Sequence, residues 1–154
     1  MPTLTTNPRA KFDYAILETF EAGMVLSGQE VKSTKNNRMS LKGSYITIKN
    51  EEVWLINAFV PPYQTKNTPE DYKPDKSRKL LLHKKEINRL IGKTKQKGLT
   101  LVPLRVYTKH NRIKLEFGLG QGRRKIDKRE KIKKREVKRR IDRALRDKGD
   151  DRHR

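Results

Sequence analysis

Lysine and arginine are the residues whose chemistry dominates this sequence. The 154-residue chain contains 39 of them against 18 aspartate and glutamate residues, giving a formal net charge of +21. Such an excess favours two kinds of partner, nucleic acid and an anionic membrane surface. Tyr63, Tyr72 and Tyr107 lie among basic residues, the combination with which small barrels stack bases and track phosphates. Each tyrosine also suits a packed position, whereas Trp54 and Phe59 are expected in the core.

Residues for catalysis are scarce by comparison. The chain has no cysteine, which excludes a thiolate nucleophile, a thiolate zinc site and a disulfide scaffold. The histidines, His83, His110 and His153, are far apart and lack metal-ligand spacing. The paired carboxylates at 51–52 and 70–71 fall in a turn and a loop, where burial does not raise a carboxyl pKa. We therefore expect a protein that is not an enzyme and uses neither a metal nor a cofactor.

A glycine-rich segment runs from Gly118 to Gly122. It is not a dinucleotide-binding fingerprint, because Arg123 stands where a further glycine is required and no strand–helix unit surrounds it. The segment is instead predicted to be a flexible joint between a folded body, residues 1–120, and a C-terminal tail, residues 121–154.

The body favours short β-strands. Between 112 and 117, apolar Ile113, Leu115 and Phe117 alternate with polar Lys114 and Glu116, which is typical of an antiparallel sheet with one wet face. The absence of a strand–helix–strand rhythm indicates a mainly β fold, a small closed or nearly closed antiparallel barrel. The predicted strands include residues 14–20, 44–49, 53–59, 99–108 and 112–117.

Two short helices and a long loop complete the body. Apolar spacing predicts one helix over 87–94, stopped by Gly98, and a second, weaker pattern covers 29–35. Residues 61–78 contain four prolines and predict a loop of a length that is often functional.

The tail is strongly basic. Residues 121–154 hold 17 basic and 7 acidic residues, and no aromatic residue follows Phe117. On a helix, Val137, Ile141 and Leu145 would form an apolar stripe too thin to fold against a core. We expect a tail that is disordered when free and helical on a polyanion, the alternative being a merely solvated tail.

Neither end nor interior suggests a membrane protein. The first eight residues lack the apolar region of a secretory signal, and no apolar stretch approaches the roughly 18 residues of a membrane span. The expectation is a cytoplasmic protein.

Several segments occur in an order and spacing that closely resemble the SsrA-binding protein family (small protein B). The resemblance runs from about Asn7 to Arg140, and the ordered set is more specific than any one motif. The segments are Asn-Pro-Arg-Ala at 7–10, Phe-Glu-Ala-Gly at 20–23, Gly-Gln-Glu-Val-Lys-Ser at 28–33, Ser-Tyr at 44–45, Arg-Lys-Leu-Leu-Leu-His at 78–83 and Gly-Arg-Arg-Lys-Ile-Asp-Lys-Arg at 122–129.

The resemblance implies an oligonucleotide-binding-type barrel with a basic tail, acting without catalysis in ribosome rescue by trans-translation. Its implied partners are transfer-messenger RNA (tmRNA), gripped by the barrel at the tRNA-like domain, and the stalled ribosome. The tail would lie as a helix in the vacant mRNA channel near the decoding centre, while elongation factor Tu would be met indirectly, through the RNA. We expect a monomer.

The resemblance also assigns residues. Asn7, Glu21, Leu81 and His83 fall at family positions implicated in tmRNA binding, and His83 replaces an asparagine of some relatives. Glu21 is unusual, because a carboxylate beside RNA needs a donor such as a 2′-OH or a base amine. Its alternative is an internal pair that positions a basic neighbour. The basic residues predicted to complete this RNA surface are Arg9, Lys32, Arg78 and Lys79.

Tail positions are implicated in ribosomal engagement after binding. Ile126 stands where many relatives carry an aromatic residue or histidine, so a stacking contact is missing at that position. The tail residues assigned to the ribosome and its mRNA channel are Gly122, Arg123, Arg124, Lys125, Asp127, Lys128, Arg129, Lys133 and Arg135.

Three other functions fit the composition less well. A generic ribosomal protein or RNA chaperone would bind any structured RNA through charge alone. A membrane-surface protein would need a helix with a real apolar face, which the tail lacks. A nuclease would need a cluster of metal-binding carboxylates, and the sequence offers no obvious one.

Overall fold

The computed structural model describes residues 2–64, 66, 68–96, 98–123, 139 and 141. The chain divides into two units, Met1–Gly122 and Arg123–Arg154. The fold below is that of the first unit. The predicted helical tail falls almost wholly outside the described residues.

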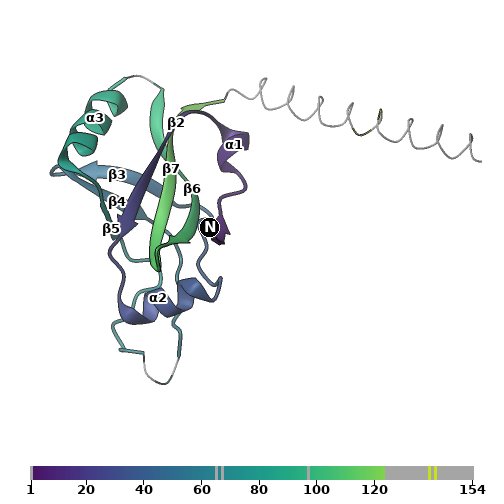
Figure 1. The fold of residues 1–154 in the computed structure, drawn as a ribbon, viewed down its shortest axis with the longest axis vertical. Helices are drawn as coiled ribbons and strands as arrows, with labels where there is room; N and C mark the ends of the chain where they lie inside the picture. Colours follow the sequence, from purple (N-terminus) through teal and green to yellow (C-terminus); the bar gives the residue numbers. More distant parts are fainter. Residues whose placement is uncertain are drawn as a thin grey trace, which may run out of the picture. The chain divides into compact units, whose positions relative to one another are not determined.

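The first unit is built on one antiparallel sheet of seven strands, in the order β1-β6-β7-β2-β5-β4-β3 (Figure 1). Edge strand β3 also contacts β6, so the sheet curls back on itself toward a barrel. The mainly β prediction is confirmed. The strands are β1 Thr3–Thr6, β2 Tyr14–Met24, β3 Tyr45–Lys49, β4 Glu52–Ile56, β5 Arg78–Leu81, β6 Leu99–Lys109 and β7 Arg112–Gly122.

Three helices accompany the sheet: α1 Ala10–Asp13, α2 Gly28–Lys35 and α3 Lys84–Thr94. Both predicted helices are present, as α2 and α3, and lie at opposite ends of the sheet (Figure 1). The single turn of α1 carries too little periodicity to be seen in sequence. No helix in the described ranges has the length and apolar character needed to cross a membrane.

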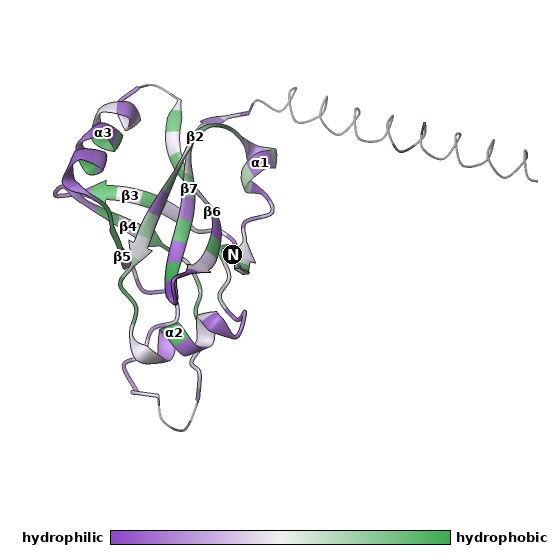
Figure 2. Ribbon diagram, viewed as in Figure 1, coloured by the Kyte–Doolittle hydropathy of each residue, from purple (hydrophilic) through white to green (hydrophobic). Residues whose placement is uncertain are grey.

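The core follows the period-2 alternation of the strands. Val53 and Leu55 of β4 are fully buried, and the ring of Phe117 in β7 stacks on Phe20 at 5.5 Å. Figure 2 shows the apolar and polar residues alternating along β7. The prediction of a core position is wrong for Trp54, which alternates with Val53 and Leu55 and is half-buried. It is wrong too for Phe59, which is 46% exposed.

The glycine-rich segment is not a joint at Gly118 and Gly120, because both lie inside β7. A Cβ added at Gly118 would stand 2.7 Å from Cγ2 of Ile16 and 3.3 Å from the carbonyl oxygen of Glu18. These glycines let β7 pack tightly against its neighbours, which sequence alone does not separate from flexibility.

The Gly118→Ala variant should lose about 1–3 kcal/mol of unfolding free energy, because its methyl group would overlap Cγ2 of the β-branched Ile16 and crowd the backbone oxygen of Glu18. Gly92→Ala, in α3, is the matched control. Nothing lies within 4 Å of its added Cβ, and the change should stabilise the protein by roughly 0.4–1 kcal/mol. Urea denaturation measures both variants. Equal stability of the two would contradict this role for Gly118.

A buried ion pair joins α2 to β5. Glu30 and Arg78 are both inaccessible to solvent, with Arg78 Nε 2.5 Å from Glu30 Oε2. Burial disfavours the ionised carboxyl, yet the Ser27 amide, Arg78 and Lys76 together hold the pKa of Glu30 below its ordinary value. The Arg78 guanidinium also donates to the carbonyls of Ala58 at 2.6 Å and Pro74 at 2.8 Å. The pair thereby fastens the ends of the long loop to the barrel.

Candidate nucleic-acid interface

A groove of about 610 Å³ runs over the outer ends of β2, β5 and β7, beside the start of α3. Three residues predicted to bind RNA line it: Glu21 from β2, Leu81 from β5 and His83 from the turn before α3. About sixty sequence positions separate Glu21 from the other two. The fold thus brings together an acceptor, an apolar surface and an imidazole.

Strand register explains this meeting. Gly23 of β2 lies opposite Leu81 of β5 on one side and opposite Lys114 of β7 on the other. Because side chains alternate along a strand, Glu21 and Gly23 share the outer face. Leu81 is 52% exposed. Its side chain therefore adds an apolar surface to the groove.

Glu21 is held by two neighbours. The hydroxyl of Tyr107 donates to Oε2, and the ammonium of Lys109 lies 3.4 Å from Oε1. The Tyr107 hydrogen bond is the main cause that lowers the pKa of Glu21. Burial, together with the same bond, raises the pKa of Tyr107. The site therefore presents an ionised, oriented carboxylate at neutral pH, with a third of its side chain (36%) exposed.

Tyr107 itself is buried, so its ring does not offer a stacking surface. It is 2% exposed, and the Arg105 guanidinium covers the ring at 4.4 Å. Arg105 in turn lies 3.4 Å from Glu116, the residue opposite Glu21. Of the two positions open to Tyr107 in sequence, the structure selects the packed one.

His83 precedes α3 at its N-cap position. Its carbonyl accepts the amide of Glu86 at 2.9 Å, while its imidazole makes no capping hydrogen bond. The ring is thus exposed and faces the groove, where it can donate or stack.

Two groove cations, Arg112 and Lys114, were not among the predicted RNA-binding residues. A signal was present, since Lys114 lies on the polar side of the alternation in 112–117. What the sequence could not supply is the register that places β7 beside β2.

The sequence pattern of the family described as SmpB protein matches residues 4–147. The chain belongs to the SmpB protein family. It is 49% identical over 142 residues to the SsrA-binding protein of Gloeothece citriformis, covering 92% of each chain. It is 50% identical over 147 residues to that of Desulforudis audaxviator, covering 96% of this chain and 95% of the relative.

A solved structure is also similar to this chain. It is described as "tmRNA-SmpB: a journey to the center of the bacterial ribosome". The TM-score is 0.65 and the sequence identity 42%, over 83% of this chain and 93% of that one. This chain and the solved one are therefore similar in sequence as well as in fold.

The remaining predicted residues of this SmpB chain do not join the groove. The Asn7 side-chain amide donates to the carbonyl of Pro103 at 2.9 Å, tying the end of β1 to β6. Arg9 lies 3.5 Å from Asp13 and 5.0 Å from the ring of Phe12. Asn7 and Arg9 line a separate hollow of about 210 Å³. If Asn7 and Arg9 contact RNA, they do so at a surface separate from the groove.

The prediction that Arg78 contacts RNA does not fit its position in the structure. It is 1% exposed, and its donors are used by Glu30 and by backbone carbonyls. We assign it to the scaffold. Lys79, next along β5, faces outward and lies 3.5 Å from Glu52. Lys32 is exposed on α2, with its ammonium 5.6 Å from the ring of Tyr63.

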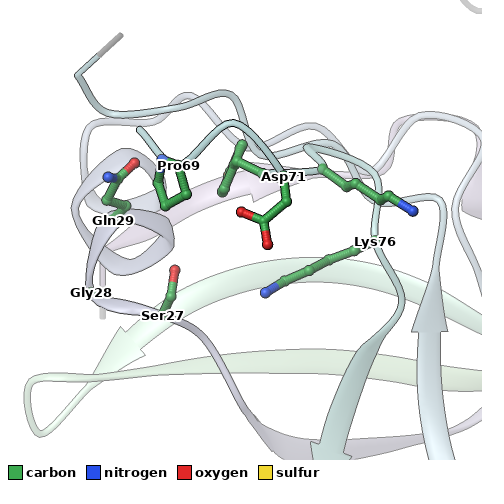
Figure 3. A pocket seen from close by; sticks show the side chains of 8 residues that line it. Ser27, Gly28, Gln29, Pro69, Asp71 and Lys76 are labelled. Carbon is green, nitrogen blue, oxygen red and sulfur yellow. The ribbon is translucent and has the colours of Figure 1, made fainter. Parts of the chain in front are cut away.

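Segment 28–33 makes contacts that stabilise the fold. Ser27 and Glu30 form a reciprocal capping box at the start of α2, and the Ser33 hydroxyl donates to the carbonyl of Pro61 at 2.6 Å. Beside it lies a hollow of about 380 Å³, in which Asp71 and Lys76 point toward the same space (Figure 3). The hollow contains Lys73 and Lys76 but gathers none of the residues predicted to bind RNA.

Of the predicted tail residues, Gly122 and Arg123 are described. Gly122 ends β7 opposite Tyr14, in open space. Within the described part of the chain, no cluster of three or more histidine, cysteine or acidic residues is placed to hold a metal. The other tail residues predicted to engage the ribosome lie outside the described residues. They are Arg124, Lys125, Asp127, Lys128, Arg129, Lys133 and Arg135.

Proposed function

We propose that this protein binds the tRNA-like domain of tmRNA and acts, without catalysis, in trans-translation on stalled ribosomes. Its relatives carry the name SsrA-binding protein, and the similar solved structure is described as tmRNA-SmpB in the bacterial ribosome. The observation that carries the proposal is the groove, which gathers Glu21, Leu81 and His83 in a chain of this family.

The groove suits RNA of a particular shape better than phosphate alone. Arg112 and Lys114 supply cations for the backbone, but the carboxylate of Glu21 repels phosphate and accepts only from a base or a 2′-OH. Leu81 offers an apolar face to a base or ribose. This mixture of groups should bind an RNA that presents matching donors and phosphates more tightly than an RNA that does not.

The tail completes the proposal. Residues 121–154 carry 17 basic and 7 acidic residues, which suits a channel lined by ribosomal RNA. Folding of the tail upon binding would make engagement depend on a channel free of mRNA. In this proposal the protein is a cytoplasmic monomer, and elongation factor Tu is met through the RNA.

Truncation separates the two parts. We expect a chain ending at Arg123 to retain most of its affinity for the tRNA-like domain, because every residue that lines the groove lies between Thr19 and Lys114. Peptide tagging on stalled ribosomes should be abolished. The cut must follow β7, since Gln121 and Gly122 pair with Ala15 and Tyr14 of β2.

Filter binding measures the first property and a reconstituted tagging assay the second. Full-length protein with Lys42→Gln and Lys49→Gln, exposed changes in the body, shows how much RNA affinity falls when two positive charges are removed away from the tail. Loss of RNA affinity together with the tail would contradict the proposed division of labour.

A further inference from the structure

The exposed face of α3 combines positive charge with a glycine that packing does not explain. We propose that this face binds the minor groove of an RNA double helix, at a surface separate from the groove over β2, β5 and β7. The inference goes beyond the proposed function, because it adds a second binding surface and names the form of RNA that the surface takes.

The geometry of the α3 face follows from the helical period. At about 100° per residue, Asn88 and Gly92 occupy the middle of the face. The opposite side of the helix carries Leu90, which is fully buried. Four exposed cations flank the middle of the face: Lys84 and Lys95 toward one side, Lys85 and Arg89 toward the other.

The positive charge of the α3 face is in excess. Glu86, the only acidic residue of α3, lines the groove and lies on another side of the helix. Glu18 of β2 lies 2.8 Å from Arg89, but Lys93 pairs with the same carboxylate, and Arg89 remains 57% exposed. Within the part of the chain that the structure describes, the three lysines of the face join no ion pair. Such an excess favours a polyanion as the partner.

Two features of this face disfavour the helix that carries it. Lys84 and Lys85 occupy the first turn of α3, where the helix dipole disfavours cations. Gly92 lies inside the helix, where glycine is destabilising relative to alanine. Its φ is not positive, and nothing lies within 4 Å of a Cβ added there. Residues that weaken an element locally are expected where they serve a function.

An RNA double helix accounts for both features. The minor groove of A-form RNA is wide and shallow, displays the 2′-hydroxyls and has a phosphate backbone along each edge. With α3 against this groove, the cations on either side of the face can meet the two backbones. Gly92 lets the helix approach closely, and the amide of Asn88 can donate to a 2′-hydroxyl or accept from it. A flexible single strand needs no such close approach, because it can bend around a side chain.

The test compares the unaltered full-length protein with its Gly92→Gln variant. The probes are a blunt RNA duplex of about 16 base pairs, a DNA duplex of the same sequence and one strand of the RNA. Gly92→Gln should weaken binding of the RNA duplex roughly tenfold and change binding of the other two probes by less than about twofold. Fluorescence anisotropy at physiological salt measures all three affinities. Because glutamine favours a helix more than glycine does, weaker binding would not result from unfolding, which urea denaturation checks.

Gly28→Gln is the matched control for the added side chain. Gly28 also has open space around its Cβ position, and it begins α2 at the other end of the sheet (Figure 1). This variant should bind the RNA duplex as the unaltered protein does.

A pair of double variants tests the charge of the α3 face. Lys84→Gln with Lys85→Gln should weaken binding of the RNA duplex roughly tenfold, because two phosphate contacts disappear. Lys35→Gln with Lys42→Gln removes the same charge at exposed positions in and after α2, and should weaken binding much less.

Two results would overturn the proposal. One is equal affinity of Gly92→Gln and unaltered protein for the RNA duplex. The other is an equal loss for the RNA duplex and either of the other probes, since the face would then attract any polyanion. Either result would leave the proposed binding of the tRNA-like domain standing, because the groove assigned to that domain includes none of the substituted residues.

Discussion

Arg78→Met is expected to destabilise the protein by about 3–5 kcal/mol, because it leaves the carboxylate of Glu30 buried without its main partner. A small domain has a total stability of only about 5–15 kcal/mol, so much of it would be lost. The same change also removes the donors that hold the carbonyls of Ala58 and Pro74. Urea denaturation at neutral pH measures the effect.

Two companions sharpen this test. Lys79→Met removes the neighbouring cation, whose pair with Glu52 is solvent-exposed, and should change stability by less than about 1 kcal/mol. The double variant Glu30→Met, Arg78→Met should be less damaged than Arg78→Met alone, since no unpaired charge remains buried. If Arg78→Met were as stable as Lys79→Met but bound RNA poorly, Arg78 would be an RNA contact and its scaffold assignment would be wrong.

The second large effect concerns the cations of the groove. Replacing both Arg112 and Lys114 by glutamine should weaken binding of the tRNA-like domain roughly tenfold or more at physiological salt. The plot of log affinity against log salt should become shallower by roughly one to two, because two phosphate contacts disappear. Fluorescence anisotropy over a range of salt concentrations measures both quantities.

The double variant Lys42→Gln, Lys49→Gln is the control for net charge. Both lysines are exposed, and neither lines the groove. Its affinity and salt dependence should stay close to those of the unaltered protein. An equal loss in both double variants would mean that overall charge, rather than the groove, drives binding.

Local patterns predicted most of the fold. Alternation and β-forming residues indicated the strands that became β2, β3, β4, β6 and β7, and helical spacing indicated α3. The same alternation, applied strictly, would have placed Trp54 on the wet face, since buried Val53 and Leu55 flank it. Expecting the largest aromatic residue to be buried overrode that pattern and gave the wrong position.

Other features depend on long-range packing. A glycine has the same letter whether it permits bending or close approach, so Gly118 and Gly120 were mistaken for a joint. Arg78 reads as one more cation in a basic segment. Only the tertiary structure shows that it lies against Glu30, a residue 48 positions away.

The candidate site was predictable by resemblance rather than by pattern. Nothing local connects Glu21 with Leu81 and His83, because strand pairing between β2 and β5 unites them. Asn7 and Arg9 were grouped with these residues in sequence but lie in a separate hollow. The role of Tyr107 in holding Glu21 required the side-chain contacts themselves.

The most direct test of the proposed function compares two RNAs of similar length at physiological salt. One is the tRNA-like part of tmRNA, and the other an elongator tRNA. We predict at least a hundredfold preference for the first, about 2.7 kcal/mol, which phosphate contacts common to both RNAs cannot supply. Equal affinity for the two RNAs would contradict the account and favour a protein that binds structured RNA through charge alone.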